Sequence, residues 1–475
     1  MSRFPDGFRV RLRADVRRLP TPGGMLLVGG SPLRAMRLAS AAWDRVRHDE
    51  LAVTDPLSDA LAGRLVDGNL ADPVTDESHL DPGELTVVVP VRDRPEQLAR
   101  CLAGLRGLTT LVVDDASRDP EAVRLAATSA GASVIALPDN LGPAGARNAG
   151  LAEVTTPYVA FVDSDVVADA ATLTALAAHL RDRAVALVGP LVRSRPRGES
   201  DGGRVHWFER FDAEVSSLAL GRRACSVRPG AAVGWLPSAC LVGRTATLRA
   251  AGGFTARMRV GEDVDLVWRL VAEGHRVRYD PDLVAHHDTR TTVRGWLGRK
   301  FVYGSGGAEL AARHGRNGAP AVMTLSYAAT AAAILLARRW SPLAGAAGLA
   351  FGWWRLDRRL PATGLPDGER RILAARLATQ GLGWAVRQES ALVLRHWWPL
   401  TALALAGAGR TRPALLRALA ACLVVDAIVS ESEHPGAPYA LLGRRLDDLA
   451  YGAGLWWGAA RARSIRCLLP RRPGS

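Results

Sequence analysis

The sequence predicts an α/β domain at the centre of the chain, between a small N-terminal module and an all-helical C-terminal region. Strand-like and helix-like segments alternate between residues 81 and 303, whereas residues 1–80 hold a few short elements and residues 304–475 show only helical patterns. Such alternation is typical of an α/β fold with a mostly parallel sheet. A chain of 475 residues also exceeds the roughly 250–300 residues at which one core usually divides.

Composition limits the class of protein and its partners. Apolar residues make up 48% of the chain, as in globular proteins, and the net charge of +14 favours anionic partners such as nucleotide diphosphates or lipid headgroups. We expect no nucleic-acid partner, because no basic stripe interleaved with aromatic residues and no zinc-ligand spacing occurs. The five cysteines are scattered without paired spacing, which favours a reduced, cytoplasmic-facing protein. Arg and Asp precede any apolar run, so the N-terminus does not read as a signal peptide.

The first 80 residues read as a hairpin followed by small helices. Alternating apolar residues predict a strand over Phe8–Leu12, and the apolar run Met25–Val28 predicts a second. Helical patterns cover Ser40–His48 and Pro56–Asp67. The segment Asp67–Gly83 is rich in Asp, Gly and Pro and is typical of a linker.

The α/β domain is predicted from short apolar runs that are rich in β-branched residues, which is typical of strands buried on both faces. These runs are Leu85–Val89, Leu111–Val113, Val134–Leu137, Tyr158–Val162 and Val185–Val188. Leu98, Cys101, Leu102 and Leu105 have the spacing of a helix that lies on a sheet. Because ligands of such folds bind at the carboxyl ends of strands, the residues that follow each strand are the candidates for function.

Acidic residues follow two of these strands. Asp163 and Asp165 come directly after Tyr158–Val162, where two carboxylates can hold a divalent cation that neutralises a diphosphate. The same pair is also compatible with a solvated turn. Asp114 and Asp115 end an earlier strand, where an acid can accept hydrogen bonds from a base and a ribose, or can cap a helix.

Three further segments carry candidate residues. Between the two acidic strand ends, the small residues of Asn140–Gly150 permit close backbone approach, and Arg147 can pair with phosphate or lie as a solvated helix charge. Glu262 and Asp263 begin a helix, where the macrodipole keeps acids ionised; they suit a general base or plain capping. His287 ends a strand-like run and can complete a cation site or pack at the strand end; alternation favours it over His286.

The order of these motifs resembles family-2 glycosyltransferases of the GT-A fold, a Rossmann-like nucleotide-diphospho-sugar transferase fold, over roughly two hundred residues. The matching pieces are Val89-Pro90-Val91 with Arg92-Asp93, Asp114-Asp115-Ala116-Ser117, Gly142–Gly150, Asp163-Ser164-Asp165, Gly252-Gly253-Phe254, Gly261-Glu262-Asp263 and the terminal histidine. The resemblance implies a UDP-sugar donor.

The resemblance also assigns roles to individual residues. It implies that Asp115, with Asp93 or Asp114, holds the uracil and ribose, and that Pro90, Arg147 and Asp163 also lie at the donor. Asp165 is then the principal ligand of Mg²⁺ or Mn²⁺, with His287 completing the site. Asp263, next to Glu262, is the catalytic base of an inverting transfer. The chain departs from processive synthases of this group, because Arg299–Gly304 stands where they carry Gln-x-x-Arg-Trp, which leaves processive chain building in doubt.

The flanking regions narrow the resemblance. Val28-Gly29-Gly30-Ser31-Pro32-Leu33-Arg34 and its surroundings look like winged-helix modules that bind precursor peptides. Together with the Ala/Trp-rich tail, the chain resembles the mycofactocin biosynthesis glycosyltransferases of actinobacteria. Membership implies transfer of glucose from UDP-glucose to premycofactocin, a peptide-derived redox cofactor precursor, and a precursor peptide as a further partner. A lipid-linked or cell-envelope glycan acceptor is an alternative, and a non-catalytic peptide-binding scaffold is another.

The C-terminal region predicts contact with the cytoplasmic face of the cell membrane, either peripheral or integral. Eight of the thirteen tryptophans lie there, and Trp is enriched at membrane interfaces. Asn317–Ala337 carries no charge and is long enough to span a bilayer. A buried alanine-rich helix and an interfacial helix are alternatives for the same segment.

Overall fold

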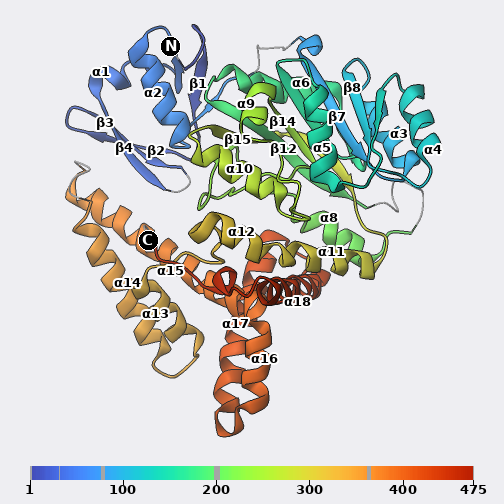
Figure 1. Cartoon of the computed structure of the whole chain (residues 1–475). Helices are drawn as coiled ribbons and strands as arrows, with labels where there is room; N and C mark the ends of the chain where they lie inside the picture. Colours follow the sequence, from blue (N-terminus) through green and yellow to red (C-terminus); the bar gives the residue numbers. More distant parts are fainter. Residues whose placement is uncertain (1–2, 31–32, 76–80, 197–203, 361–364, 474–475) are drawn as a thin grey trace. The chain divides into compact units, whose positions relative to one another are not determined.

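The chain folds into two compact units (Figure 1). The computed structural model describes residues 3–30, 33–75, 81–196, 204–360 and 365–473. The first unit comprises Met1–Leu19, Gly23–Val205 and Val215–Thr289, and the second comprises Pro20–Pro22, His206–Glu214 and Arg290–Ser475. Most of the first 80 residues therefore share a unit with the α/β region.

The N-terminal part contains two small sheets and a helix. Strands β1 (Arg9–Leu12), β5 (Glu50–Ala52) and β6 (Ala71–Pro73) form one sheet, in the order β5-β1-β6. Strands β2 (Arg17–Thr21), β3 (Gly24–Gly29) and β4 (Arg34–Ala39) form the other, and α1 (Ser40–Trp43) and α2 (Pro56–Asp67) accompany them. Apolar residues of these elements share one core, among them Phe8, Val10, Leu27, Leu61 and Leu65.

The predicted helix Pro56–Asp67 is confirmed, and the Asp55 side chain caps it by accepting from Ser58 N at 2.7 Å. The predicted helix Ser40–His48 is shorter in the structure and ends at Trp43. The chain then turns at His48 and Asp49, both with positive φ, and enters β5. The predicted linker is partly ordered, since β6 pairs with β1. Residues 76–80 of that linker, and Ser31 and Pro32 of the Val28–Arg34 motif, lie outside the described residues.

Ion pairs join this N-terminal part to the α/β region. Arg3 Nη2 lies 2.6 Å from Asp182 Oδ2, and Arg276 Nε lies 2.8 Å from Asp67 Oδ1. The buried Arg278 places Nη2 2.8 Å from Asp72 Oδ1. Removing one partner of a buried pair usually costs more than the pair contributes, since a charge is left without compensation. The N-terminal elements are therefore firmly attached within the first unit.

The α/β region is built on a mixed sheet. Its strands are β7 (Leu85–Val91), β8 (Thr109–Asp114), β9 (Ser133–Ala136), β10 (Tyr158–Val162), β11 (Val166–Val167), β12 (Val185–Arg195), β13 (Cys225–Val227), β14 (Cys240–Arg244) and β15 (Arg276–Asp288). The order is β11-β15-β12-β14-β10-β7-β8-β9, with β13 paired to β15. The run β10-β7-β8-β9 is parallel, as expected, but β14 is antiparallel to both of its neighbours.

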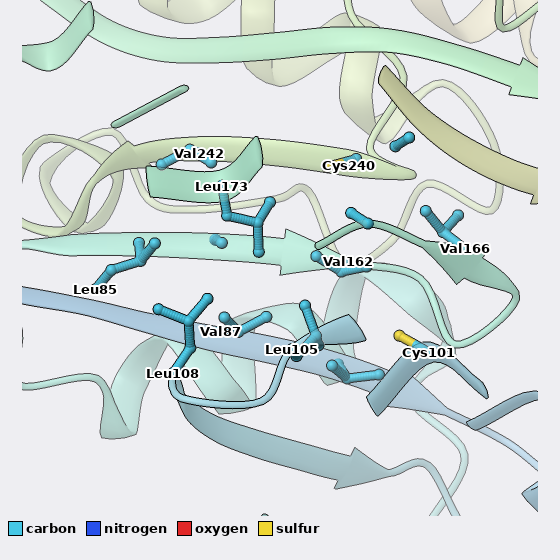
Figure 2. Packing of buried hydrophobic residues seen from close by; sticks show 14 of the residues in the cluster. Leu85, Val87, Cys101, Leu105, Leu108, Val162, Val166, Leu173, Cys240 and Val242 are labelled. Atoms are coloured by element: carbon cyan, nitrogen blue, oxygen red, sulfur yellow. The ribbon is translucent and has the colours of Figure 1, made fainter. Parts of the chain in front are cut away.

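The core of this region explains why its strands were readable from sequence. All seven residues of β7 are buried, and Figure 2 shows Leu85 and Val87 within the cluster that also contains Leu105 and Val162. Each buried Val or Leu contributes about 1.5–3 kcal/mol relative to an exposed one. Helices α3 (Pro95–Gly104), α4 (Pro120–Ser129), α5 (Gly142–Glu153), α6 (Ala170–Ala178), α9 (Thr245–Ala250) and α10 (Glu262–Ala272) complete the region. The parallel strands β7, β8 and β10 end at a common edge, which carries the acidic residues.

The C-terminal region, predicted to be helical, is built from helices in the residues that the structure describes, and it makes up most of the second unit. The helices of that unit are α8 (Trp207–Glu214), α11 (Val293–Ser305), α12 (Gly307–His314), α13 (Leu325–Leu335), α14 (Ser341–Asp357), α15 (Asp367–Ala391), α16 (Trp398–Gly407), α17 (Arg412–Glu433) and α18 (Pro438–Arg461). Glycines let α11 and α18 pack backbone to backbone: a Cβ at Gly454 would lie 1.9 Å from Phe301 O. Lys300 of α11 is buried and places Nζ 2.9 Å from Asp447 Oδ1 of α18.

Asn317–Ala337 is not one continuous helix, so of the three alternatives left open for this segment the structure does not support the membrane-spanning one. Gly315–Gly318 forms a 3₁₀ turn, Val322 makes a β-bridge to Arg471, and only Leu325–Leu335 is α-helical. Eleven residues extend about 16 Å, roughly half the thickness of a bilayer core. Within the described residues, one other segment, Gly409–Glu433, is long and apolar enough to cross a membrane by length and composition, with a mean hydropathy of 1.9 and 17% of its window buried.

Candidate active site

The acidic loop after β10 lies at the centre of the site. Asp163 N donates to Ala239 O at 3.0 Å, and Asp165 precedes the short strand β11, in which Val166 pairs with His287 of β15. This pairing brings Asp165 and His287 together although they are far apart in sequence. Asp165 Oδ2 and His287 Nε2 lie 3.7 Å apart.

Asp165 and His287 have the chemistry of a divalent-cation site. Their 3.7 Å separation is too long for a hydrogen bond. Mg²⁺ sites often use one or two protein ligands together with substrate phosphates. In the parts of the chain that the structure describes, no group of three or more His, Cys, Asp or Glu residues is placed to hold a metal ion.

Arg147 of α5 links this loop to the start of α10. Its side chain is 2% exposed, and it places Nη2 2.5 Å from Asp163 Oδ1 and Nη1 3.2 Å from Glu262 Oε1. The guanidinium also lies over the Phe254 ring, 5.3 Å from its centroid. Arg147 was expected either to pair with phosphate or to lie as a solvated helix charge, whereas both terminal nitrogens contact protein carboxylates. Burial raises the pKa of Asp163, the Asp165 carboxylate adds to this, and Arg147 opposes it.

Asp263 occupies the first turn of α10. Its Oδ1 accepts a hydrogen bond from Val264 N at 2.8 Å, and its Oδ2 accepts from Ser238 N at 3.2 Å. Burial and the adjacent Glu262 carboxylate raise the pKa of Asp263 to about 7, against these two N–H donors and Arg147. A carboxyl with a pKa near neutrality can accept a proton during catalysis and release it again.

The acids at the ends of β7 and β8 form hydrogen bonds with the backbone of neighbouring loops. Asp93 Oδ1 accepts from Arg118 N at 2.8 Å, Asp114 Oδ1 accepts from Ser117 N at 3.0 Å, and Asp115 Oδ1 accepts from Leu141 N at 2.6 Å. Pro90 lies in β7 opposite Val113 of β8. These bonds fix the three acids at the edge of the sheet where β7 and β8 end.

Backbone strain accompanies these strand ends. Asp93 and Arg94 have φ of 60° and 63°, and Ala116 has φ of 55°. Left-handed conformations of residues other than glycine cost of order 1–3 kcal/mol and cluster at functional sites. The strain therefore supports a functional interpretation of this edge.

The structure adds residues that sequence reasoning missed. Arg94 Nη1 lies 3.4 Å from Asp165 Oδ2, and Ser238 supplies an N–H to Asp263. Asn148, next to Arg147, holds the Gly252-Gly253-Phe254 turn: its Nδ2 donates to Phe254 O at 2.7 Å, and its Oδ1 accepts from Phe254 N at 2.8 Å. The Gly252-Gly253-Phe254 motif could have indicated this pair of hydrogen bonds from the sequence.

Comparisons with known proteins identify the family of the chain. Residues 86–229 match the model of the family described as Glycosyl transferase family 2, and residues 158–408 match that of Glycosyl transferase family group 2. The chain belongs to glycosyltransferase family 2. The expected enzyme class and GT-A fold are thereby confirmed.

Individual relatives of this glycosyltransferase sharpen the comparison. It is 40% identical over 480 residues to the pre-mycofactocin glycosyltransferase of Mycobacterium tuberculosis (strain CDC 1551 / Oshkosh), with 99% of each chain covered. It is 27% identical over 253 residues to an N-acetylglucosaminyltransferase of Bradyrhizobium diazoefficiens, covering 48% of this chain and 51% of that protein. A solved mannosyltransferase from Pyrobaculum calidifontis, in complex with GDP-Man and Mn²⁺, is similar with a TM-score of 0.44 and 20% identity, covering 80% and 90% of the two chains. The predicted resemblance to the mycofactocin biosynthesis glycosyltransferases is confirmed by the full-length relative.

Proposed function

We propose that this enzyme transfers glucose from UDP-glucose to premycofactocin with inversion at the anomeric carbon. The full-length similarity to a pre-mycofactocin glycosyltransferase supports the acceptor. The observation that carries the mechanism is the half-buried Asp263 at the start of α10, joined through Glu262 and Arg147 to the acidic loop after β10.

The donor's nucleoside is assigned to the acids at the ends of β7 and β8. Each of Asp93, Asp114 and Asp115 uses Oδ1 in a backbone hydrogen bond. Oδ2 of each carboxylate is then the atom that we expect to accept from the uracil N3–H or a ribose hydroxyl. Pro90 lines the same edge, and Asp163 reaches toward the ribose.

Asp165 and His287 are the proposed ligands of a divalent cation, Mg²⁺ or Mn²⁺. When bound, such a cation neutralises the charge of the UDP diphosphate as it leaves. Arg94, 3.4 Å from Asp165, is a further cation at this position and lies where it can contact a phosphate oxygen.

Asp263 is the proposed base. It accepts the proton of the acceptor hydroxyl while that oxygen forms a bond to C1 of the glucose, and the bond from C1 to the diphosphate oxygen breaks. Attack from the face opposite the leaving UDP inverts the configuration. The two N–H donors from Val264 and Ser238 aim the carboxylate, and Glu262 contributes by its pairing with Arg147.

The test of this proposal uses the purified full chain with UDP-glucose, a divalent cation and premycofactocin, and identifies the product by mass spectrometry. We expect a hexose-bearing premycofactocin and stoichiometric UDP. Transfer to a polyprenyl or envelope-glycan acceptor instead would contradict the proposed acceptor. That alternative is favoured by one specific observation, the exposed apolar helices of the second unit.

We also propose that the second unit contacts the cytoplasmic face of the cell membrane peripherally. Helix α16 has no buried residue, and α17 beside it (Figure 1) exposes an apolar stripe of Leu416, Leu423, Val424 and Ile428. Membrane interfaces attract such helices when arginines flank them. Asp426 on the opposite face of α17 is buried and lies 3.1 Å from Arg444 of α18. This ion pair holds α17 to the protein and argues against a spanning helix.

Vesicle flotation tests this contact. The full chain should float with vesicles of anionic phosphatidylglycerol and less with neutral phosphatidylcholine. Leu416→Ser combined with Leu423→Ser should reduce flotation, whereas Leu125→Ser, at an exposed leucine of α4 in the first unit, should not. A protein that stays unbound with both vesicle types would contradict the proposal.

The N-terminal part remains the proposed site for a precursor peptide.

A further inference from the structure

The buried guanidinium of Arg147 connects the acidic loop after β10 to the acidic residues that begin α10. Arg147 lies in α5, Asp163 follows β10, and Glu262 begins α10, so three segments distant in sequence converge on one guanidinium. Both contacts are short, 2.5 Å to Asp163 and 3.2 Å to Glu262. Two opposing carboxylates on one planar fork define a direction as well as a distance.

The surroundings of Arg147 restrict the positions that its side chain can adopt. The side chain is 2% exposed, and the ring of Phe254 lies below the guanidinium. Asn148 makes two hydrogen bonds to the backbone of Phe254. The neighbouring Gly253 packs closely against Asn148, since a Cβ there would lie 2.4 Å from Asn148 Oδ1. Helix α5 therefore holds both the turn before α10 and the loop that contains Asp163.

We propose that Arg147 is a positioning residue that fixes the proposed base, Asp263, relative to the cation-binding loop after β10. Asp263 directly follows Glu262, so the Arg147–Glu262 contact sets where the first turn of α10 lies. This inference rests on the proposed role of Asp263. It assigns Arg147 to the geometry of the transfer step and removes it from direct contact with the donor's phosphates.

The expected effects separate positioning from donor binding. A displacement of about 1 Å in a catalytic group can lower turnover about 100-fold. Arg147→Met should therefore lower kcat about 100-fold while the Kd for UDP with Mn²⁺, measured by calorimetry, changes less than about threefold. Arg147→Lys should recover part of kcat, because a single ammonium can contact one carboxylate but cannot span both.

A pH profile supplies a readout that a structural role would not move. Glu262 raises the pKa of Asp263, whereas the N–H groups of Val264 and Ser238 and the Arg147 guanidinium lower it. Arg147→Met should therefore move the acid limb of kcat/KM to higher pH, and Glu262→Gln should move it to lower pH. The double variant should be non-additive, since the two side chains are in contact.

Arg249→Met is the matched control. Arg249 holds the other end of α5, where its Nη2 donates to Leu151 O at 2.7 Å. It should lower stability without moving the pH profile or kcat per folded molecule. The proposal is overturned if Arg147→Met behaves like Arg249→Met, or if it raises the Kd for UDP tenfold with kcat unchanged. Failure of the base assignment is separate, because it would appear as wild-type turnover in Asp263→Asn.

Discussion

Replacing Asp263 with Asn should remove activity and, at the same time, stabilise the first unit at neutral pH. The activity should fall about 10²–10⁴-fold, the usual contribution of a positioned base. The stability gain follows from linkage. The folded-state pKa of Asp263 is about 7 against an ordinary 3.8. Above pH 7 the folded enzyme therefore holds a buried charge that an Asn side chain lacks.

The sign and size of the effect can be worked through. Between pH 4 and pH 7 the folded state binds a proton that the unfolded state has released, so wild-type stability decreases as pH rises through this window. About three pKa units correspond to roughly 4 kcal/mol. The Asn substitution also lowers the free energy of unfolding by about 1–3 kcal/mol, because its amide cannot accept from both Val264 N and Ser238 N. A net gain of about 1–3 kcal/mol should raise Tm by a few degrees.

Calorimetric unfolding and UDP release measure the two halves of this prediction. Tm of Asp263→Asn should exceed that of wild type at pH 8 and should fall below it near pH 4, where only the lost hydrogen bond distinguishes the two proteins. Asp265→Asn, two residues along the same helix, is the control: it breaks a buried pair with Arg269 at 2.9 Å and should lower Tm. A lower Tm for Asp263→Asn at pH 8, or unchanged turnover, would refute the reasoning.

Further predictions follow from the same contacts. The kcat/KM of the wild type should fall below about pH 7 with one apparent pKa, and a profile flat to pH 5 would contradict the role of Asp263. Asp165→Asn and His287→Ala should each weaken Mn²⁺-dependent UDP binding at least tenfold by calorimetry, because either change removes one of two protein ligands; unchanged metal dependence would exclude the pair. Lys300→Met should lower Tm, because the buried ammonium pairs with both Asp447 and Asp212 and breaking a buried pair costs about 3–5 kcal/mol of unfolding free energy; an unchanged Tm would show that these pairs are solvated.

The strands of the α/β region could be predicted because each is a short, continuous apolar run. Tyr158–Val162 is a strand in the structure with the same bounds as in the prediction. The acids after these strands were predictable for the same reason, since a strand end fixes where the following residues emerge. The antiparallel strand β14 was missed, because Cys240–Arg244 is brief and lies between segments without clear periodicity.

The position of Arg147 could not be predicted, because its partner Glu262 is distant in sequence and a lone arginine in a helix is usually solvated. The interpretation of Asn317–Ala337 as a helix long enough to span a membrane did not hold, for a different reason. Hydropathy does not register that Thr324 caps α13, where its Oγ1 accepts from Tyr327 N at 3.4 Å, or that Val322 pairs with Arg471. The position of Arg147 and the bridge from Val322 to Arg471 both depend on contacts between segments, which residue patterns along one segment do not contain.

The anomeric configuration of the product tests the central claim most directly. Purified full-length enzyme would be supplied with UDP-α-glucose and premycofactocin, and the product's anomeric proton would be examined by NMR. Inverting transfer with Asp263 as the base predicts a β-linked glucose. An α-linked product, or no transfer to premycofactocin in the presence of Mg²⁺ or Mn²⁺, would contradict it.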